Sequence, residues 1–159
     1  MERESSTARG PVQVGSRAPD FTLPDPSGRP VRLSDYVGKS AVVLYFYPKD
    51  YTLGCTREAC AFRDRYESFK AAGAEVIGIS SDPPGSHERF ASQYQLPFLL
   101  LSDVDGEVSK LYGVRKVFGL LRGRVTFVID REGIVRQIYW NQLAFEKHVT
   151  EALTALTKT

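Results

Sequence analysis

The junction around which the chain is organised reads Tyr45-Phe46-Tyr47-Pro48-Lys49-Asp50-Tyr51-Thr52-Leu53-Gly54-Cys55-Thr56-Arg57-Glu58-Ala59-Cys60. The apolar run over residues 41–47 predicts a buried strand. That strand ends at Pro48, because proline has no N–H to donate to a sheet ladder. A short polar turn follows, and the apolar spacing after it predicts a helix that begins near Cys55. The junction therefore places a cysteine at the start of a helix that follows a buried strand.

A thiol at this position lies beside unpaired backbone N–H groups and the positive end of the helix dipole, and both favour an anion. A free cysteine has a pKa of about 8.5, so only about 3% of it is thiolate at neutral pH. Helix N-termini and nearby cations can lower that pKa by about one unit or more. We therefore predict that Cys55 is a reactive thiolate and not a packed thiol.

Bulk composition restricts the class of protein. The 159 residues are 42% apolar and 25% charged, which is typical of one soluble globular domain. The net charge is +2, from 21 basic and 19 acidic residues, and no basic block suggests nucleic-acid binding. No apolar run approaches the ~18 residues of a membrane span, and the first ten residues are not a secretory signal. We therefore expect a cytoplasmic protein without membrane contact, where a cysteine pair favours catalysis or redox sensing over a structural staple.

The pattern of elements predicts an α/β fold with a central mixed sheet and helices on both faces. We expect a flexible N-terminal tail over residues 1–14 and one domain over residues 15–159. Parallel pairing follows from the alternation of strands and helices, and a C-terminal hairpin adds antiparallel strands. The expected strands cover residues 31–33, 41–47, 74–80, 98–101, 125–129 and 134–140. The expected helices cover residues 56–72, 86–95, about 107–112 and 144–156, and residues 113–123 form an irregular loop.

A Cys-x4-Cys pair alone is weak evidence, since two inert buried thiols are the more ordinary interpretation. The surrounding residues are more specific. Pro48-x3-Thr52-x2-Cys55 between a strand and a helix matches the active-site motif of the peroxiredoxins. The longer junction resembles the bacterioferritin comigratory protein or peroxiredoxin Q branch of that family. Three further stretches resemble the same family: Ala18-Pro19-Asp20-Phe21-x-Leu23-Pro24 and Leu33-Ser34-Asp35-Tyr36-x-Gly38-Lys39 near the start, and Arg124-Val125-Thr126-Phe127-Val128-Ile129-Asp130 later.

The resemblance implies a thioredoxin-like fold and a thiol-dependent peroxidase that reduces hydrogen peroxide and organic hydroperoxides. It implies that Cys55 is the peroxidatic cysteine and that Pro48, Thr52 and Arg124 complete its pocket. It further implies that Cys60 resolves the oxidised Cys55 as an intramolecular disulfide, which thioredoxin or a similar dithiol protein reduces. No cofactor or metal is expected, and we expect a monomer.

Reduction of a peroxide by a thiol needs chemical groups that Cys55 and Arg124 carry. Attack on an O–O bond needs an anionic sulfur and stabilisation of the departing oxygen, and Arg124 offers a permanent cation with several fixed donors. The product is a sulfenic acid, which condenses with a second thiol. Because the two cysteines are five positions apart on one helix, too far for a disulfide, we expect a regular helix in the reduced protein and local unwinding in the oxidised one.

Several alternatives stay open. Glu58 either orients an arginine or is an ordinary first-turn acid of the helix. His87 and His148 have no cysteine or carboxylate partner at ligand spacing, so we expect packing or surface roles. The segment 118–121 is either core or a patch that meets a reductase. Two rival functions are a thioredoxin-class disulfide oxidoreductase, disfavoured by C-x4-C in place of C-x2-C, and a non-enzymatic redox-switched binding protein.

Overall fold

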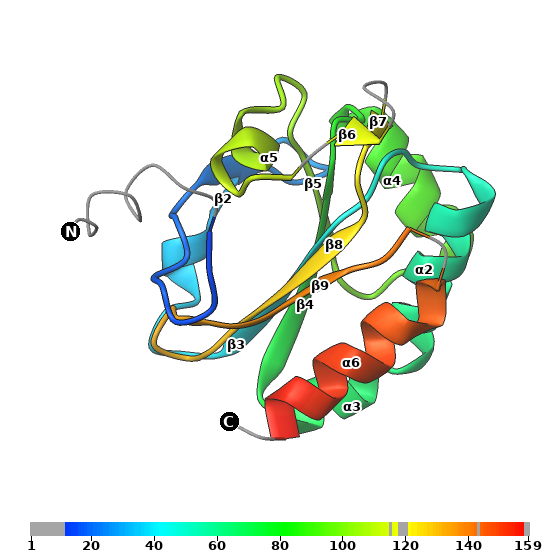
Figure 1. The fold of residues 1–159 in the computed structure, drawn as a ribbon. Coiled ribbons are helices and arrows are strands. Elements are labelled where there is room, and N and C mark those ends of the chain that lie inside the picture. Colours follow the sequence, from blue (N-terminus) through cyan, green and yellow to red (C-terminus); the bar gives the residue numbers. More distant parts are fainter. Residues whose placement is uncertain (1–11, 115, 118–120, 143, 158–159) are drawn as a thin grey trace.

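Strand β3 (Ala41–Phe46) is the central strand of a five-stranded sheet in the computed structural model, which describes residues 12–114, 116–117, 121–142 and 144–157. The strand order is β5-β4-β3-β8-β9 (Figure 1). β4 (Ala74–Ser80) pairs with β3 in parallel, and β5 (Leu99–Ser102) pairs with β4 in parallel. β8 (Val125–Ile129) and β9 (Val135–Trp140) form the antiparallel half. The predicted mixed sheet is confirmed.

Helices cover both faces of the sheet, but unequally. One face packs against α2 (Leu53–Asp64), α3 (Tyr66–Ala71), α4 (Pro84–Tyr94) and α6 (Phe145–Thr157). The other face packs against the short helix α5 (Glu107–Leu111), the 3-10 turn η1 (Leu33–Asp35) and the hairpin of β1 (Thr22–Pro24) and β2 (Pro30–Arg32). The two parallel crossovers advance in the same direction across the sheet, from β3 to β4 to β5. Right-handed crossovers therefore place their helices on one face.

Alternation along β3 creates the two cores. Val42, Leu44 and Phe46 belong to the cluster under the hairpin, whereas Val43 and Tyr45 belong to the cluster under the helices. All six residues of the strand are buried. Both faces are therefore sealed, and functional groups gather at the carboxyl end of β3, where the chain leaves the sheet.

Two elements differ from the sequence-based expectation, and one expected patch cannot be compared. The helix expected over residues 56–72 is two helices, α2 and α3, separated at Arg65, whose backbone N–H bonds to the carbonyl of Phe62. The apolar period continues across this break because Phe62 and Phe69 pack in the same cluster. The irregular loop at 113–123 contains the two-residue strands β6 (Lys116–Val117) and β7 (Leu121–Arg122). The patch expected at 118–121 lies mostly outside the described residues.

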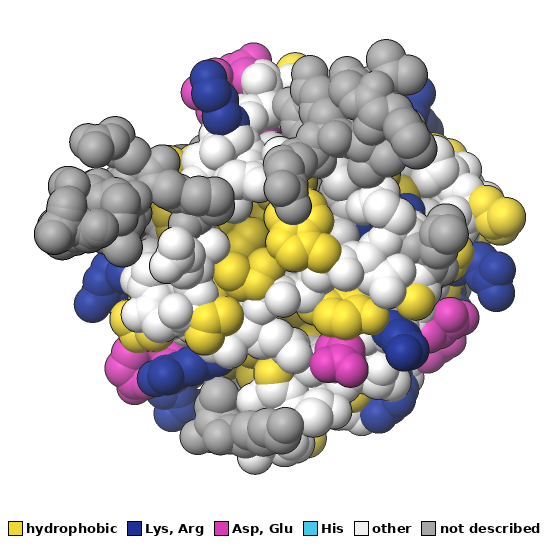
Figure 2. Space-filling model, in the orientation of Figure 1, with side chains coloured by type: hydrophobic (Ala, Val, Ile, Leu, Met, Phe, Trp, Pro, Cys, Tyr) yellow, Lys and Arg dark blue, Asp and Glu magenta, His cyan; other side chains and the backbone are white. Residues whose placement is uncertain are grey.

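The start of the described chain and the surface of the molecule lie outside these two cores. Most of the tail expected at 1–14 lies outside the described residues, although Val12 already packs against the core. None of the helices in the described part of the chain is long and apolar enough to cross a membrane. On the face drawn in Figure 2, basic and acidic side chains are interspersed, and hydrophobic side chains gather near the middle.

Candidate active site

The loop from Pro48 to Thr52 delivers Cys55 into the interior. Thr52 is the N-cap residue of α2, its carbonyl accepts the N–H of Thr56 at 2.9 Å, and its hydroxyl donates to the carbonyl of Lys49 at 3.0 Å. Tyr51 supports the tight turn with a left-handed backbone (φ 68°), which a non-glycine residue adopts only at some cost. Cys55 is thus the third residue of α2, and only 1% of it is exposed.

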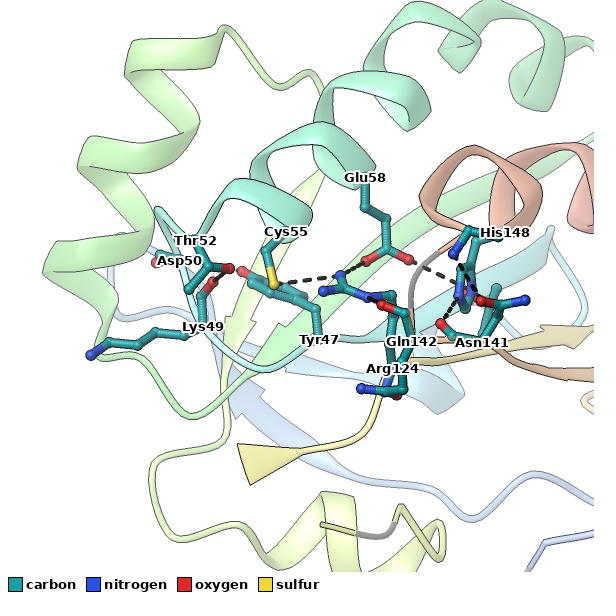
Figure 3. Close-up of polar contacts among 12 residues, drawn as sticks. Tyr47, Lys49, Asp50, Thr52, Cys55, Glu58, Arg124, Asn141, Gln142 and His148 are labelled. Atoms are coloured by element: carbon teal, nitrogen blue, oxygen red, sulfur yellow. Dashed lines mark hydrogen bonds and ion pairs between the residues drawn. The ribbon is translucent and has the colours of Figure 1, made fainter. Parts of the chain in front are cut away.

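Arg124 reaches Cys55 from the other half of the sheet. It immediately precedes β8, and the pairing of Phe46 with Val125 brings the end of β3 beside the start of β8. The Nη1 group of Arg124 donates to the Sγ atom of Cys55 at 3.4 Å and to Oε1 of Glu58 at 2.6 Å (Figure 3). The guanidinium and both acids are buried. Of the open interpretations of Glu58, the structure therefore selects an ion pair with Arg124.

The remaining predicted residues are near the pocket but are less directly engaged. Pro48 is half-buried at the start of the loop, and its shielding role stays a prediction. Cys60 is half-buried on the same helix, and both thiols are free. α2 runs without interruption through both cysteines, as expected for the reduced protein. On an ideal helix, Cα atoms five positions apart in the sequence lie roughly 8–9 Å from each other, and their side chains point in directions about 140° apart.

The pKa of the Cys55 thiol is not lowered as the sequence suggested. Burial raises it above its ordinary value, although Arg124 and Thr52 act in the opposite direction, and the charge of Glu58 adds to the increase. Burial also raises the pKa of Glu58 to about 7, against the opposing effect of Arg124. Burial alone would lower the pKa of Arg124, but Glu58 and Cys55 outweigh it, so the pKa is raised and the group stays a cation.

One cation is therefore shared by two acids. When Glu58 is ionised, it neutralises much of the charge that Arg124 offers to a Cys55 thiolate. When Glu58 is protonated, that charge is available to the sulfur. The two groups titrate as a coupled pair, so the ionisation of Cys55 depends on the protonation state of Glu58.

His148 lies behind Glu58 and is completely buried. Its Nε2 atom is 2.7 Å from the carbonyl oxygen of Asn141, and its Nδ1 atom is 2.7 Å from the hydroxyl of Thr126. The carbonyl must accept, so we assign the proton to Nε2, and Nδ1 accepts from Thr126. Burial lowers the pKa of His148 to about 4, which keeps the ring neutral. Of the packing and surface roles expected for His148, the structure shows a packed ring, and its Nδ1 atom also lies 3.6 Å from Oε2 of Glu58, a carboxylate contact that the sequence spacing did not indicate.

His87 holds the loop from Pro48 to Thr52 in place through Asp50. Its Nδ1 atom lies 2.8 Å from Oδ2 of Asp50, and its Nε2 atom lies 3.0 Å from the carbonyl oxygen of Leu101. Asp50 also accepts the hydroxyls of Tyr47 at 2.6 Å and Ser86 at 2.8 Å. These contacts tie the loop to α4 and β5. His87 has no carboxylate at ligand spacing in the sequence, but the fold brings it to Asp50, 37 residues away, and this pair was not predicted.

The side chains of Asp50, Asp82 and His87 bring possible metal-ligand atoms within 4.8 Å of one another. Asp82 already accepts the backbone N–H of Asp50 at 2.7 Å and the hydroxyl of Ser80 at 2.6 Å. Every ligand group of the trio is therefore engaged in hydrogen bonds, and we assign the cluster a structural role.

Comparison with known proteins identifies the family. A family model described as the AhpC/TSA family matches residues 14–138. The chain belongs to this family. Chloroplastic peroxiredoxin Q of Sedum lineare is 56% identical over 146 residues, which cover 91% of this chain and 78% of the relative. Chloroplastic peroxiredoxin Q of Arabidopsis thaliana is 58% identical over 146 residues, which cover 91% of this chain and 67% of the relative.

Solved peroxiredoxin structures agree. The peroxidoxin BcpB of Mycobacterium tuberculosis has a TM-score of 0.86 and 39% identity, covering 92% of this chain and 97% of its own. Peroxiredoxin Q of Xanthomonas campestris has a TM-score of 0.82 and 29% identity, covering 92% and 96%. The predicted thioredoxin-like fold and the peroxiredoxin Q resemblance are confirmed. As a peroxiredoxin, the protein is a thiol-dependent peroxidase and an oxidoreductase, and its family implies a peroxide substrate and a thioredoxin-type reductant.

The expected cytoplasmic location is wrong. The Sedum, rice and Arabidopsis relatives are all named chloroplastic. Composition and net charge were the basis of that expectation, and neither one distinguishes a cytoplasmic protein from a chloroplastic one.

Proposed function

We propose that the Sγ atom of Cys55 attacks the peroxide and that the positive charge of Arg124 stabilises this sulfur as a thiolate. The observation that supports this is the contact of 3.4 Å between Nη1 of Arg124 and Sγ of Cys55 in a buried pocket. The Cys55 thiolate attacks one oxygen of a hydroperoxide, the O–O bond breaks, and the departing oxygen takes a proton to leave as an alcohol or water. The sulfur is oxidised to a sulfenic acid, and the peroxide receives two electrons.

Arg124 and Thr52 act on the peroxide itself in this proposal. The guanidinium has donors beyond those given to Cys55 and Glu58, and these stabilise the charge that develops on the departing oxygen. The hydroxyl of Thr52 donates to the carbonyl of Lys49, which leaves its oxygen free to accept the O–H of the substrate. Pro48 excludes water from the pocket without adding an N–H that would compete for the peroxide.

Cys60 resolves the sulfenic acid. Its thiol attacks the sulfur of Cys55, a disulfide forms, and the hydroxyl leaves as water. Both cysteines lie on α2 of the same chain, so no second subunit is needed, and we propose that the protein works as a monomer. A thioredoxin-type dithiol then reduces the disulfide by thiol–disulfide exchange, which restores both thiols.

The test is consumption of NADPH coupled through thioredoxin reductase and thioredoxin, with hydrogen peroxide or an organic hydroperoxide as substrate. We expect multiple turnovers that depend on both peroxide and thioredoxin. Cys55→Ser should abolish them, because a serine hydroxyl is not ionised near neutral pH and cannot form a sulfenic acid. Substantial turnover in that variant would refute the assignment of Cys55.

The rival functions give different results in the same assay. A disulfide oxidoreductase would reduce a protein disulfide without any requirement for peroxide. A redox-switched binding protein would consume one equivalent of peroxide and then stop, even with thioredoxin present. The spacing of the cysteines and the Arg124 contact favour the peroxidase over both.

A further inference from the structure

Phe145, the first residue of α6, lies over the guanidinium of Arg124. The Cζ atom of Arg124 is 4.8 Å from the centroid of the Phe145 ring, which is within the range of a cation–π contact. Arg57 is a second cation near the same ring, at 6.0 Å. No sequence pattern indicated this contact, because Phe145 belongs to the apolar face of the last helix and lies far from the cysteine motif along the chain.

The same ring also packs against Gly54. A Cβ atom added to Gly54 would lie 2.6 Å from Cε1 and 2.7 Å from Cζ of Phe145, and 3.0 Å from Nη2 of Arg124. Real Cβ atoms do not approach ring carbons so closely, so a side chain at this position requires the ring to move. Gly54 has no positive φ, and its need for a small residue is therefore one of space. The ring occupies the space beside the residue that precedes Cys55.

The polar partners of Arg124 act only on the edges of its planar group. Glu58 and Cys55 accept from Nη1 at 2.6 and 3.4 Å, and the carbonyl of Gln142 accepts from Nε at 3.4 Å. Because these hydrogen bonds lie at the edges of the guanidinium plane, the plane can still tilt about the line from Nη1 to Nε. A ring against one face opposes that tilt and keeps water from the face.

We propose that Phe145 is a positioning residue for the peroxidase reaction, which holds the guanidinium of Arg124 against Cys55 and requires glycine at position 54 to do so. This inference rests on the proposed roles of Cys55 and Arg124. It goes beyond them because it assigns a function to an aromatic side chain of α6 and a reason for the glycine beside the cysteine. Phe145 acts through Arg124 and takes no part in bond making.

The first test compares Phe145→Leu with Phe145→Tyr. Leucine keeps an apolar side chain but removes the π face, whereas tyrosine keeps it. Loss of a cation–π contact predicts a rate constant for peroxide attack that falls roughly two- to thirty-fold in Phe145→Leu, with most of that loss recovered in Phe145→Tyr. The pH at which Cys55 becomes reactive to an alkylating agent should rise in the leucine variant and return in the tyrosine variant. Equal rates and equal pH profiles in the two variants would overturn the inference.

A double-mutant cycle separates positioning from general packing. In an Arg124→Ala background, Phe145→Leu should cause no further loss of rate, because the group that Phe145 positions is gone. An undiminished loss in that background would show that Phe145 acts elsewhere. The proposed function fails separately, through activity retained in Cys55→Ser, so the two failures are distinguishable.

The second test uses the glycine, and Gly54→Ala alone stays decisive if Phe145→Leu unfolds, because an unchanged rate of peroxide attack in that variant would contradict the proposed contact. Gly54→Ala should slow peroxide attack by displacing the ring. The slowing caused by Gly54→Ala should be much smaller in a Phe145→Ala background than in wild type, because the obstructing ring is absent and only Nη2 of Arg124, 3.0 Å from the added Cβ, remains close. Equal slowing by Gly54→Ala in both backgrounds would contradict the proposed contact.

Discussion

Formation of the Cys55–Cys60 disulfide should unwind the first half of α2. The reduced protein has a continuous helix over Leu53–Asp64. Two Cα atoms five residues apart on such a helix are roughly 8–9 Å apart, whereas a disulfide tolerates about 4.4–6.8 Å. The bond therefore cannot form on an intact helix. Unwinding should stop near Phe62, which is fully buried and stacked on Tyr45 with a centroid separation of 4.5 Å.

The ion pair between Glu58 and Arg124 sets the scale of this opening. Both side chains are buried, and unwinding removes Glu58 from its partner. Breaking a buried ion pair costs about 3–5 kcal/mol, so the helix should be open in roughly one of every 100 reduced molecules, or in fewer. Backbone amides over residues 56–61 should therefore be protected from exchange at least roughly 100-fold in the reduced protein. The disulfide should abolish most of that protection.

Amide hydrogen exchange measured by mass spectrometry on both redox forms checks this prediction. Peptides from α3 (Tyr66–Ala71) serve as an internal control and should not change. Cys60→Ser treated with one equivalent of peroxide is the matched control, because it oxidises at Cys55 without forming the bond. Unchanged protection of α2 in protein shown to carry the intramolecular disulfide would refute the reasoning.

Three further predictions concern the charged groups of the site. Arg124→Ala should slow peroxide attack roughly 100-fold, as for loss of an oxyanion donor, and Arg124→Lys should restore it only in part. Arg122→Ala is the control in stopped-flow measurements, and comparable rates for all three variants would count against Arg124. Glu58→Gln should lower the pH at which Cys55 reacts with an alkylating agent, since the charge of Glu58 raises the pKa of that thiol; an upward shift would contradict the shared-cation account. His87→Gln should reduce the free energy of unfolding in urea by roughly 1–3 kcal/mol, because it removes a buried hydrogen-bond partner of Asp50, and adding Asp50→Asn should cost less than Asp50→Asn costs in the wild type; fully additive losses would show that the two side chains do not act as a pair.

The stability of the protein should also depend on pH through Glu58. Its pKa is raised to about 7 from 4.5, so the folded state holds a proton that the unfolded state releases between these values. The free energy of unfolding therefore falls as pH rises across this window. His148 acts oppositely between about 4 and 6.5, because its folded pKa is lowered. Glu58→Gln removes only the first effect, so its stability relative to wild type should rise between pH 4.5 and 7, by about 3 kcal/mol. A flat difference in urea denaturation would contradict this.

Local patterns predicted the elements that depend on local physics. β4 and β8 have the bounds that their apolar runs suggested, and the strand-to-helix junction places Cys55 where the motif required. The break at Arg65 was hidden because the same apolar face continues on both sides of it.

Features that depend on tertiary contact could not be found from the sequence alone. The pair of His87 and Asp50 and the ring of Phe145 over Arg124 join residues distant in the sequence. The direction of the Cys55 pKa shift was also missed. A helix terminus and a cation suggest a lowered value, but the extent of burial that opposes them is visible only in the folded chain.

The most direct test of the central claim locates the first oxidised sulfur. Cys60→Ser, treated with one equivalent of hydrogen peroxide in the presence of dimedone, should carry the sulfenic acid adduct on Cys55 when its peptides are analysed by mass spectrometry. Wild-type protein under the same conditions should instead show the Cys55–Cys60 disulfide. An adduct on Cys60 in Cys55→Ser that forms as fast as the adduct on Cys55 in Cys60→Ser would contradict the account.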